Sequence, residues 1–245
     1  MAVQRINLLG VPVDVCRPED LESTILELMA KPGTKQIVFL SIWNLLKARR
    51  QNDYAECIRN ADLILPVSKS ILKGAKSLKL AVPVRYNPFD AVISIMSVLD
   101  AHYKSMYFLG SRKVMLQSAE RHVRDTFPKL QIVGRYVGYY PKPIEKDVIQ
   151  AIYKSSPSLV LLCDGIREKD VWAYHRRNQF SSSIFLYYRD AIGIFSERVH
   201  RVNEETFKRG HEIWIEILRN PFKIFLIFPY MWYKLLLLYT RLRKK

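Results

Sequence analysis

Short apolar runs alternate with amphipathic stretches along most of this chain, and no other feature of the sequence limits the possible folds as much. Segment 36–40 is a compact apolar run typical of a buried strand, whereas 113–126 has the pattern of an amphipathic helix. Strands that are separated by helices form a mostly parallel sheet with helices on both faces. We therefore predict a Rossmann-like α/β fold, in which ligands bind beyond the carboxyl ends of the strands.

The predicted elements follow one another closely, and most connections have the usual length of about 4 to 6 residues. Segment 67–89 is the exception, and its length marks it as a candidate functional loop. The predicted strands are 6–9, 11–15, 36–40, 62–65, 106–109, 131–133, 158–163 and 183–188, and the predicted helices are 18–29, 43–51, 90–103, 113–126, 144–154 and 169–178.

A chain of 245 residues can bury one sizeable core, and no linker rich in Gly, Pro or Ser divides it. We predict one α/β domain at 1–205 and a helical, basic and aromatic appendage at 206–245. The net charge of +16 favours an anionic partner, which is a nucleic acid, an anionic lipid or a phosphorylated substrate. Because the basic residues are spread along the chain while aromatic residues gather in the apolar tail, we expect a membrane rather than a nucleic acid.

The three cysteines are far apart and lie in mostly apolar stretches, so we predict buried thiols in a reducing compartment. The first residues, MAVQRINLLGVPVDV, lack the basic region and long apolar run of a signal peptide. We expect a cytoplasmic protein that lies peripherally on the inner face of the cell membrane.

The tail, PFKIFLIFPYMWYKLLLLYTRLRKK, interleaves aromatic and basic residues. Its longest uncharged run, 224–233, is interrupted by Pro229 and is far shorter than the ~20 apolar residues of a membrane span. A segment that lies in the membrane interface fits this composition, with the terminal basic residues against anionic lipid. The alternative is a helix that packs back on the domain.

Several common catalytic patterns are missing from the sequence. It has no Gly-x-Ser-x-Gly elbow, no phosphate loop and no dinucleotide fingerprint, and its five histidines lack metal-ligand spacing. We therefore expect neither a cofactor nor a metal ion.

Short segments at the predicted strand ends, taken in order, resemble the WecG/TagA/CpsF family of glycosyltransferases from about residue 5 to the tail. Segment 9–12 matches the family's Leu-Gly-Val-Pro-like opening, and 61–66 matches its Ala-Asp-Leu-Val-Leu-Pro-Asp-Gly. Arg85 and Asp90 fall on its Arg-Val-Ala-Gly-Ser-Asp. Segment 108–110 matches its Phe-Leu-Leu-Gly-Gly, and Gly138 with Tyr139 matches its Gly-Tyr-Phe. The family's C-terminal pattern resembles 212–218 followed by 221–223.

The resemblance implies an inverting, metal-independent transfer of a sugar from a UDP donor to a polyprenyl-diphosphate-linked acceptor. The chain departs from the pattern where the family has its favoured general base, since Val67 and Ser68 replace Asp and Gly. A valine cannot accept a proton from the acceptor hydroxyl. The family's Gly-x-Pro-Lys-Gln-Glu and Gly-Gly-Ala-Phe-Asp are also altered, at 165–170 and 189–193.

Substrate contacts are predicted by the same matches. Arg85 offers a planar fork to diphosphate oxygens, with a solvated surface arginine as the alternative. Asp90 either accepts hydrogen bonds from sugar hydroxyls or caps a helix, and Tyr139 either stacks on uracil or packs in the core. Further candidates are Ser41, Asn44, Gly110, Gly138 and Arg201, where the glycines either let the backbone approach a ligand or allow tight turns.

An active enzyme needs a replacement base, and Asp90, Asp164 and Asp190 are the carboxylates that we place near strand ends. The other hypothesis is a catalytically inactive relative that keeps the fold and the membrane tail as a scaffold. The sequence does not identify the sugar or the acceptor. An oligomer is possible, and the sequence does not decide the oligomeric state.

Overall fold

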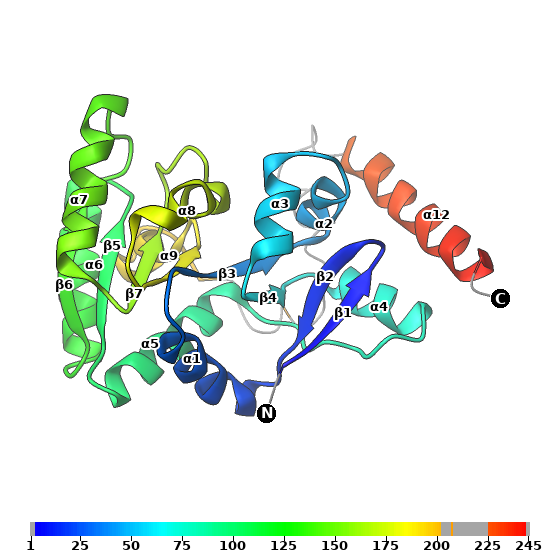
Figure 1. Ribbon diagram of the computed structural model, residues 1–245, viewed down its shortest axis with the longest axis horizontal. Coiled ribbons are helices and arrows are strands. Elements are labelled where there is room, and N and C mark those ends of the chain that lie inside the picture. The colour runs from blue at the N-terminus through cyan, green and yellow to red at the C-terminus, as the bar shows by residue number, and fades with distance from the viewer. Residues whose placement is uncertain (1–2, 202–206, 208–224, 244–245) are drawn as a thin grey trace.

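The computed structural model of the protein describes residues 3–201, 207 and 225–243, and its centre is a six-stranded parallel sheet (Figure 1). The strand order is β4-β3-β8-β7-β5-β6, and every neighbouring pair is parallel. The α/β prediction is therefore confirmed. The strands are β3 (Lys35–Leu40), β4 (Leu63–Pro66), β5 (Ser105–Leu109), β6 (Gln131–Tyr136), β7 (Leu159–Leu162) and β8 (Ile184–Tyr187).

Helices cover both faces of this sheet, as predicted. They are α1 (Leu21–Ala30), α2 (Ile42–Ala48), α3 (Asp53–Asn60), α4 (Lys69–Ser77), α5 (Pro88–Ala101), α6 (Lys113–Thr126), α7 (Glu145–Ser155), α8 (Asp170–Arg176), α9 (Ala191–Phe195) and α12 (Ile227–Arg243). Short 3₁₀ turns occur at Pro18–Asp20, Lys142–Ile144 and Arg177–Gln179.

Successive residues of a strand point to opposite faces, so the central strands supply apolar side chains to two layers. On one face Phe108 and Leu161 pack with α1, α5, α6 and α9. On the other face Ile64 packs with α2, α3 and α4, and Phe185 packs with α7 and α8. The carboxyl ends of the parallel strands are left at one edge of the sheet. The predicted buried, free thiols are also present at Cys16, Cys57 and Cys163.

The first two strands, β1 (Gln4–Leu8) and β2 (Val11–Val15), form a separate antiparallel hairpin. Leu9 and Gly10 make its turn with positive φ angles of 55° and 87°. The Asn7 side chain accepts a hydrogen bond of 2.7 Å from the Gly10 amide, which stabilises this turn.

Two predictions of local structure were wrong. Segment 67–89 is not a continuous loop, because it contains α4, whose Ile71 and Ala75 pack into the core at helical spacing. The predicted helix 43–51 ends early at Ala48, and a new helix, α3, begins after Asn52, whose side chain accepts a hydrogen bond from the Ala55 amide. The short helix α9 was not predicted.

The C-terminal helix α12 lies at the α2–α4 end of the molecule, far from β6 (Figure 1). Its Tyr233 and Leu237 are buried, and the Tyr233 hydroxyl donates a 2.8 Å hydrogen bond to the Ser70 carbonyl in α4. Gly74 allows this contact, since an added Cβ would collide with that hydroxyl. One face of α12 therefore packs back on the domain.

Across the described parts of the chain, no helix has both the length and the apolar character that a membrane crossing demands. The predicted domain boundary at 205/206 and the family-like segment 212–218 lie outside the described residues.

Candidate active site at the strand ends

The carboxyl ends of the sheet bring together residues that are far apart in the sequence. Ser41 follows β3, Val67 follows β4, Gly110 follows β5, Asp164 comes two residues after β7, and Arg189 comes two residues after β8. Most of the predicted site residues therefore lie along one edge, but they divide into three groups with different surroundings.

The first group lies at the ends of β5, β6 and β7, and its glycines serve backbone packing. An added Cβ would lie 2.8 Å from the Asp164 carbonyl oxygen at Gly110 and 2.5 Å from the same atom at Gly138. The Ser111 amide donates a 2.5 Å hydrogen bond to this carbonyl, and the Gly138 amide donates one of 2.8 Å to the Ser111 carbonyl. These glycines allow three strand-end loops to approach one another.

The polar side chains of this group are exposed and bind one another. The Tyr139 hydroxyl donates a short hydrogen bond to the Asp164 carboxylate, and this bond raises the pKa of Tyr139. Arg189 Nε lies 3.4 Å from Asp164 and 3.9 Å from Asp190. The side chains of Asp164 and Asp190 are 42% and 48% exposed, so solvent screens both carboxylates.

The second group contains Arg85 and Asp90 in a pocket of about 510 Å³ beside α5. Arg85 donates 2.9 Å and 2.5 Å hydrogen bonds to the carbonyls of Val67 and Phe207, and its guanidinium lies 3.7 Å from the Phe207 ring centroid. Burial lowers the Arg85 pKa to about 10. Asp90 forms a close ion pair with Arg201. Arg85 therefore joins the end of β4 to residue 207.

The third group lies at the ends of β3, β4 and β8, around a pocket of about 290 Å³. Ser41 caps α2 by accepting a 3.2 Å hydrogen bond from the Asn44 amide. The pocket is lined by Ser41, Asn44 and Val67 together with residues that were not among our candidates, chiefly Lys47, Tyr54, Asp170, Tyr188 and Arg189.

Asp170 and Tyr54 are the unusual members of this pocket. The exposed fraction is 7% for Asp170 and 5% for Tyr54, and the Tyr54 hydroxyl has no hydrogen-bond partner among the described residues. Burial raises the pKa of Asp170 from its usual 3.8 to about 7. In the sequence, Asp170 takes the place of the glutamate in the altered Gly-x-Pro-Lys-Gln-Glu segment of the family, and no local pattern signals its burial.

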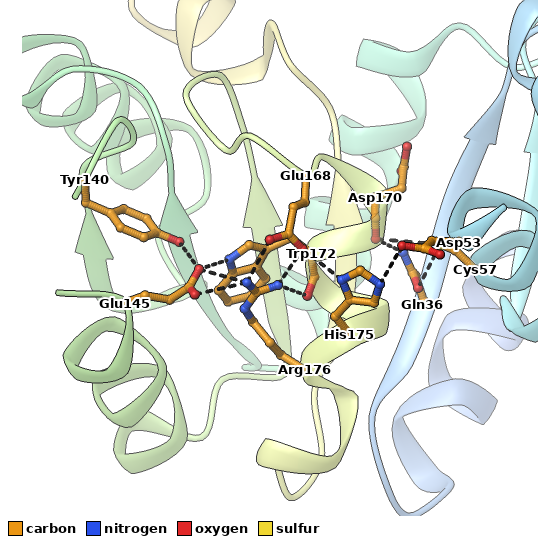
Figure 2. Close-up of polar contacts among 10 residues, drawn as sticks. All are labelled: Gln36, Asp53, Cys57, Tyr140, Glu145, Glu168, Asp170, Trp172, His175 and Arg176. Atoms are coloured by element: carbon orange, nitrogen blue, oxygen red, sulfur yellow. Dashed lines mark hydrogen bonds and ion pairs between the residues drawn. The ribbon is translucent and has the colours of Figure 1, made fainter. Parts of the chain in front are cut away.

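A charged cluster holds α8, and with it Asp170, in place (Figure 2). Arg176 contacts Glu145 at 3.0 Å and Glu168 at 2.8 Å, which ties α8 to α7. His175 lies 3.4 Å from Asp53 at the start of α3. The Gln36 side chain in β3 donates a 2.7 Å hydrogen bond to the backbone carbonyl of Asp170.

Glu168 and Asp170 are two residues apart and point in different directions (Figure 2). Glu168 turns into the charged cluster, where hydrogen bonds from Arg176 lower its pKa to about 2. The carboxyl group of Asp170 points away from the cluster. Both residues line the third-group pocket. Glu168 is thus ionised at neutral pH, whereas Asp170 changes its charge near neutral pH.

Comparison with known proteins agrees with this architecture. The model of the glycosyl transferase WecG/TagA/CpsF family matches residues 6–245. The chain belongs to this family. The N-acetylglucosaminyldiphosphoundecaprenol N-acetyl-beta-D-mannosaminyltransferase of Bacillus spizizenii is 24% identical over 176 residues, which cover 71% of this chain and 67% of that protein.

Within this WecG/TagA/CpsF chain, Val67 lies in the third-group pocket, and its backbone carbonyl is engaged by Arg85. Among the described residues, no three His, Cys, Asp or Glu side chains gather where they could hold a metal ion. The positive groups along the edge are instead arginine and lysine side chains, of which Arg189 and Lys47 line this pocket.

Proposed function

We propose that this protein transfers a hexosyl or N-acetylhexosaminyl group from a UDP-sugar to a polyprenyl-diphosphate-linked acceptor in cell-envelope or exopolysaccharide synthesis, with inversion at the anomeric carbon. The observation that carries the proposal is the family match over 6–245. The pocket at the ends of β3, β4 and β8 supports it, because open parallel sheets bind ligands at this edge. The name of the Bacillus relative supplies the acceptor class.

The charges at this edge suit a donor that carries a diphosphate. Arg189 and Lys47 line the third-group pocket, and Arg85 donates a hydrogen bond to the carbonyl of Val67, which lines it as well. Guanidinium groups bind phosphate oxygens through two parallel hydrogen bonds. In this proposal Arg85 exchanges its bond to the Phe207 carbonyl for a phosphate oxygen when the donor binds.

We also propose that α12 brings the enzyme to the inner face of the cell membrane. The apolar side chains opposite its buried Tyr233 are more than half exposed and recur at helical spacing; they are Phe228, Met231, Trp232, Leu235, Leu238, Tyr239 and Leu242. Such a face, followed by a basic end, is typical of a helix that lies in a membrane interface.

Vesicle sedimentation tests this part of the proposal. The protein should sediment with phosphatidylglycerol vesicles, and the double change Leu235→Glu and Leu238→Glu should abolish this, because two charges would enter the apolar face. Phosphatidylcholine vesicles serve as the control for lipid charge. Unchanged sedimentation of the double variant would refute membrane binding through this face.

The donor site is tested by calorimetric titration with UDP and with UDP-N-acetylhexosamines. We expect saturable binding that weakens at least tenfold in Arg85→Ala, since a charged hydrogen bond to phosphate contributes about 1.5 to 3 kcal/mol. Arg121→Ala, which removes an exposed arginine of α6, should bind like the wild type. Absence of binding to every nucleotide sugar at millimolar concentration would favour the other candidate, an inactive scaffold, for which the valine at position 67 is the specific argument.

A further inference from the structure

The third-group pocket contains a carboxyl group although Val67 has replaced the family's aspartate. Asp170 enters it from the first turn of α8, and Val67 enters it from the end of β4. Ser41 and Asn44 line the same pocket. The pocket that lacks the usual base at position 67 therefore still holds an acid, at the position of the glutamate in the family's Gly-x-Pro-Lys-Gln-Glu segment.

We propose that Asp170 is the general base of this enzyme and removes the proton from the acceptor hydroxyl. This inference rests on the proposed glycosyltransferase function. Under this proposal, the valine at position 67 means that the base lies elsewhere in the pocket, and not that catalysis is lost.

The proposed reaction is a single displacement. The acceptor O–H bond breaks and its proton passes to the Asp170 carboxylate, while the oxygen forms a bond to the anomeric carbon of the sugar. The bond from that carbon to the diphosphate oxygen breaks on the opposite side, and UDP leaves with the electron pair. Asp170 then releases its proton to solvent, which restores the carboxylate for the next cycle.

The environment of Asp170 suits a base that must gain and lose a proton. Burial raises its pKa to about 7, near the working pH of a cytoplasmic enzyme, and Lys47 and Lys169 oppose this shift only partly. Asp170 interacts electrostatically with titratable or charged groups on the elements packed around it. These groups are Lys47 of α2, Tyr54 and Cys57 of α3, Tyr187 of β8, and the neighbouring Lys169.

The other carboxylates near the edge are less suitable. Asp164 and Asp190 share Arg189, and Asp90 is paired with Arg201. Glu168 is held by Arg176 with a pKa of about 2, so it is a weak base. Burial also raises the pKa of Asp190, but Asp164 and Asp190 are far more exposed than Asp170.

The buried hydroxyl of Tyr54 is an independent sign that a ligand group belongs in this pocket. It lines the pocket and lacks a hydrogen-bond partner among the described residues. An unpaired buried hydroxyl is costly, and an incoming sugar or acceptor hydroxyl would satisfy it.

The test compares single-turnover rates at pH 7.5 for the wild type, Asp170→Asn and Asp170→Glu. The assay uses saturating UDP-N-acetylhexosamine and a short polyprenyl-diphosphate-linked N-acetylglucosamine. We expect Asp170→Asn to lower the rate by about 10² to 10⁴, whereas donor affinity stays within threefold. The rate of Asp170→Glu should be at least tenfold higher than that of Asp170→Asn. The control Asp125→Asn, which changes an exposed residue of α6, should have the wild-type rate.

A rate for Asp170→Asn within threefold of the wild type, in a folded protein that still binds donor, would overturn the assignment of the base. A comparable loss in Asp164→Asn, Asp190→Asn or Asp90→Asn, with Asp170→Asn unaffected, would move the base to that residue. A wild type that neither binds donor nor transfers sugar would overturn the proposed function itself, and this inference with it.

Discussion

The two halves of the strand-end edge are built in opposite ways. At the ends of β5, β6 and β7, Tyr139 and Asp164 are exposed and bind each other over closely packed glycine backbones, and Asp164 also contacts Arg189 from the end of β8. At the ends of β3 and β4, Asp170 and Tyr54 are buried around a pocket, and the Tyr54 hydroxyl lacks a partner among the described residues. The first half completes its own hydrogen bonds, whereas the second leaves polar groups that a substrate could use.

The largest difference that we expect between the two halves is the pH dependence of the free energy of unfolding, which Asp170 causes. Between about pH 4 and pH 7 the unfolded chain has released the Asp170 proton while the folded protein keeps it, so wild-type stability falls as the pH rises through this range. Asp170→Asn removes this penalty. Three pKa units correspond to about 4 kcal/mol, so we expect the variant to be more stable than the wild type by up to that amount at pH 8.

Urea unfolding at pH 4.5 and pH 8 measures this difference. The advantage of Asp170→Asn should shrink to about 1 kcal/mol at pH 4.5, because the folded wild type is then protonated at Asp170 and the pH lies only about 0.7 units above the usual pKa of 3.8 that Asp170 has in the unfolded chain. A variant that is less stable than the wild type at pH 8 would show that Asp170 has a structural role.

Gly138→Ala tests the packed half of the edge. The added methyl would lie 2.5 Å from the Asp164 carbonyl oxygen, a backbone atom that cannot move alone. We expect a loss of about 2 to 3 kcal/mol in urea unfolding. Gly10→Ala is the matched control, since no atom lies within 4 Å of its added Cβ and only the left-handed backbone costs about 1 kcal/mol. Equal losses for the two variants would contradict close packing as the reason for Gly138.

Val67→Asp in the Asp170→Asn background returns a carboxylate to the position where the family has its base. Both positions line the same pocket, so we expect the transfer rate to rise about tenfold over Asp170→Asn alone, equivalent to about 1.4 kcal/mol. Val67→Asn in the same background supplies equal volume without a base. If both double variants behave alike, a carboxylate at position 67 does not reach the acceptor proton.

The sheet could be predicted from the sequence because its strands are compact apolar runs, such as Leu159–Leu162, that are buried on both faces. Helix α4 was missed because Ile71, Ala75 and Leu78 repeat at helical spacing over only two turns between lysines. Helix α9 has five residues and offers even less pattern.

The candidate site was harder to predict than the fold. The order of strands places Ser41, Gly110 and Asp164 at one edge, and this follows from the alternation of strands and helices. The burial of Asp170 does not follow from this alternation, because it depends on Tyr54 of α3 and Gln36 of β3, which are more than 100 residues away in the chain. Sequence reasoning therefore favoured Asp90, Asp164 and Asp190. In the structure Asp164 and Asp190 lie beside Arg189, and Asp90 is paired with Arg201.

The central claim is that Asp170, an acid buried at the start of α8 against α3 and β3, removes the acceptor proton, and the pH dependence of wild-type transfer tests it most directly. With saturating donor and acceptor between pH 5.5 and pH 8.5, we predict a rate that falls about tenfold per unit below pH 7, because only ionised Asp170 accepts the proton. The residual rate of Asp170→Asn should lack this dependence. A wild-type rate that stays constant down to pH 5.5 would contradict the account.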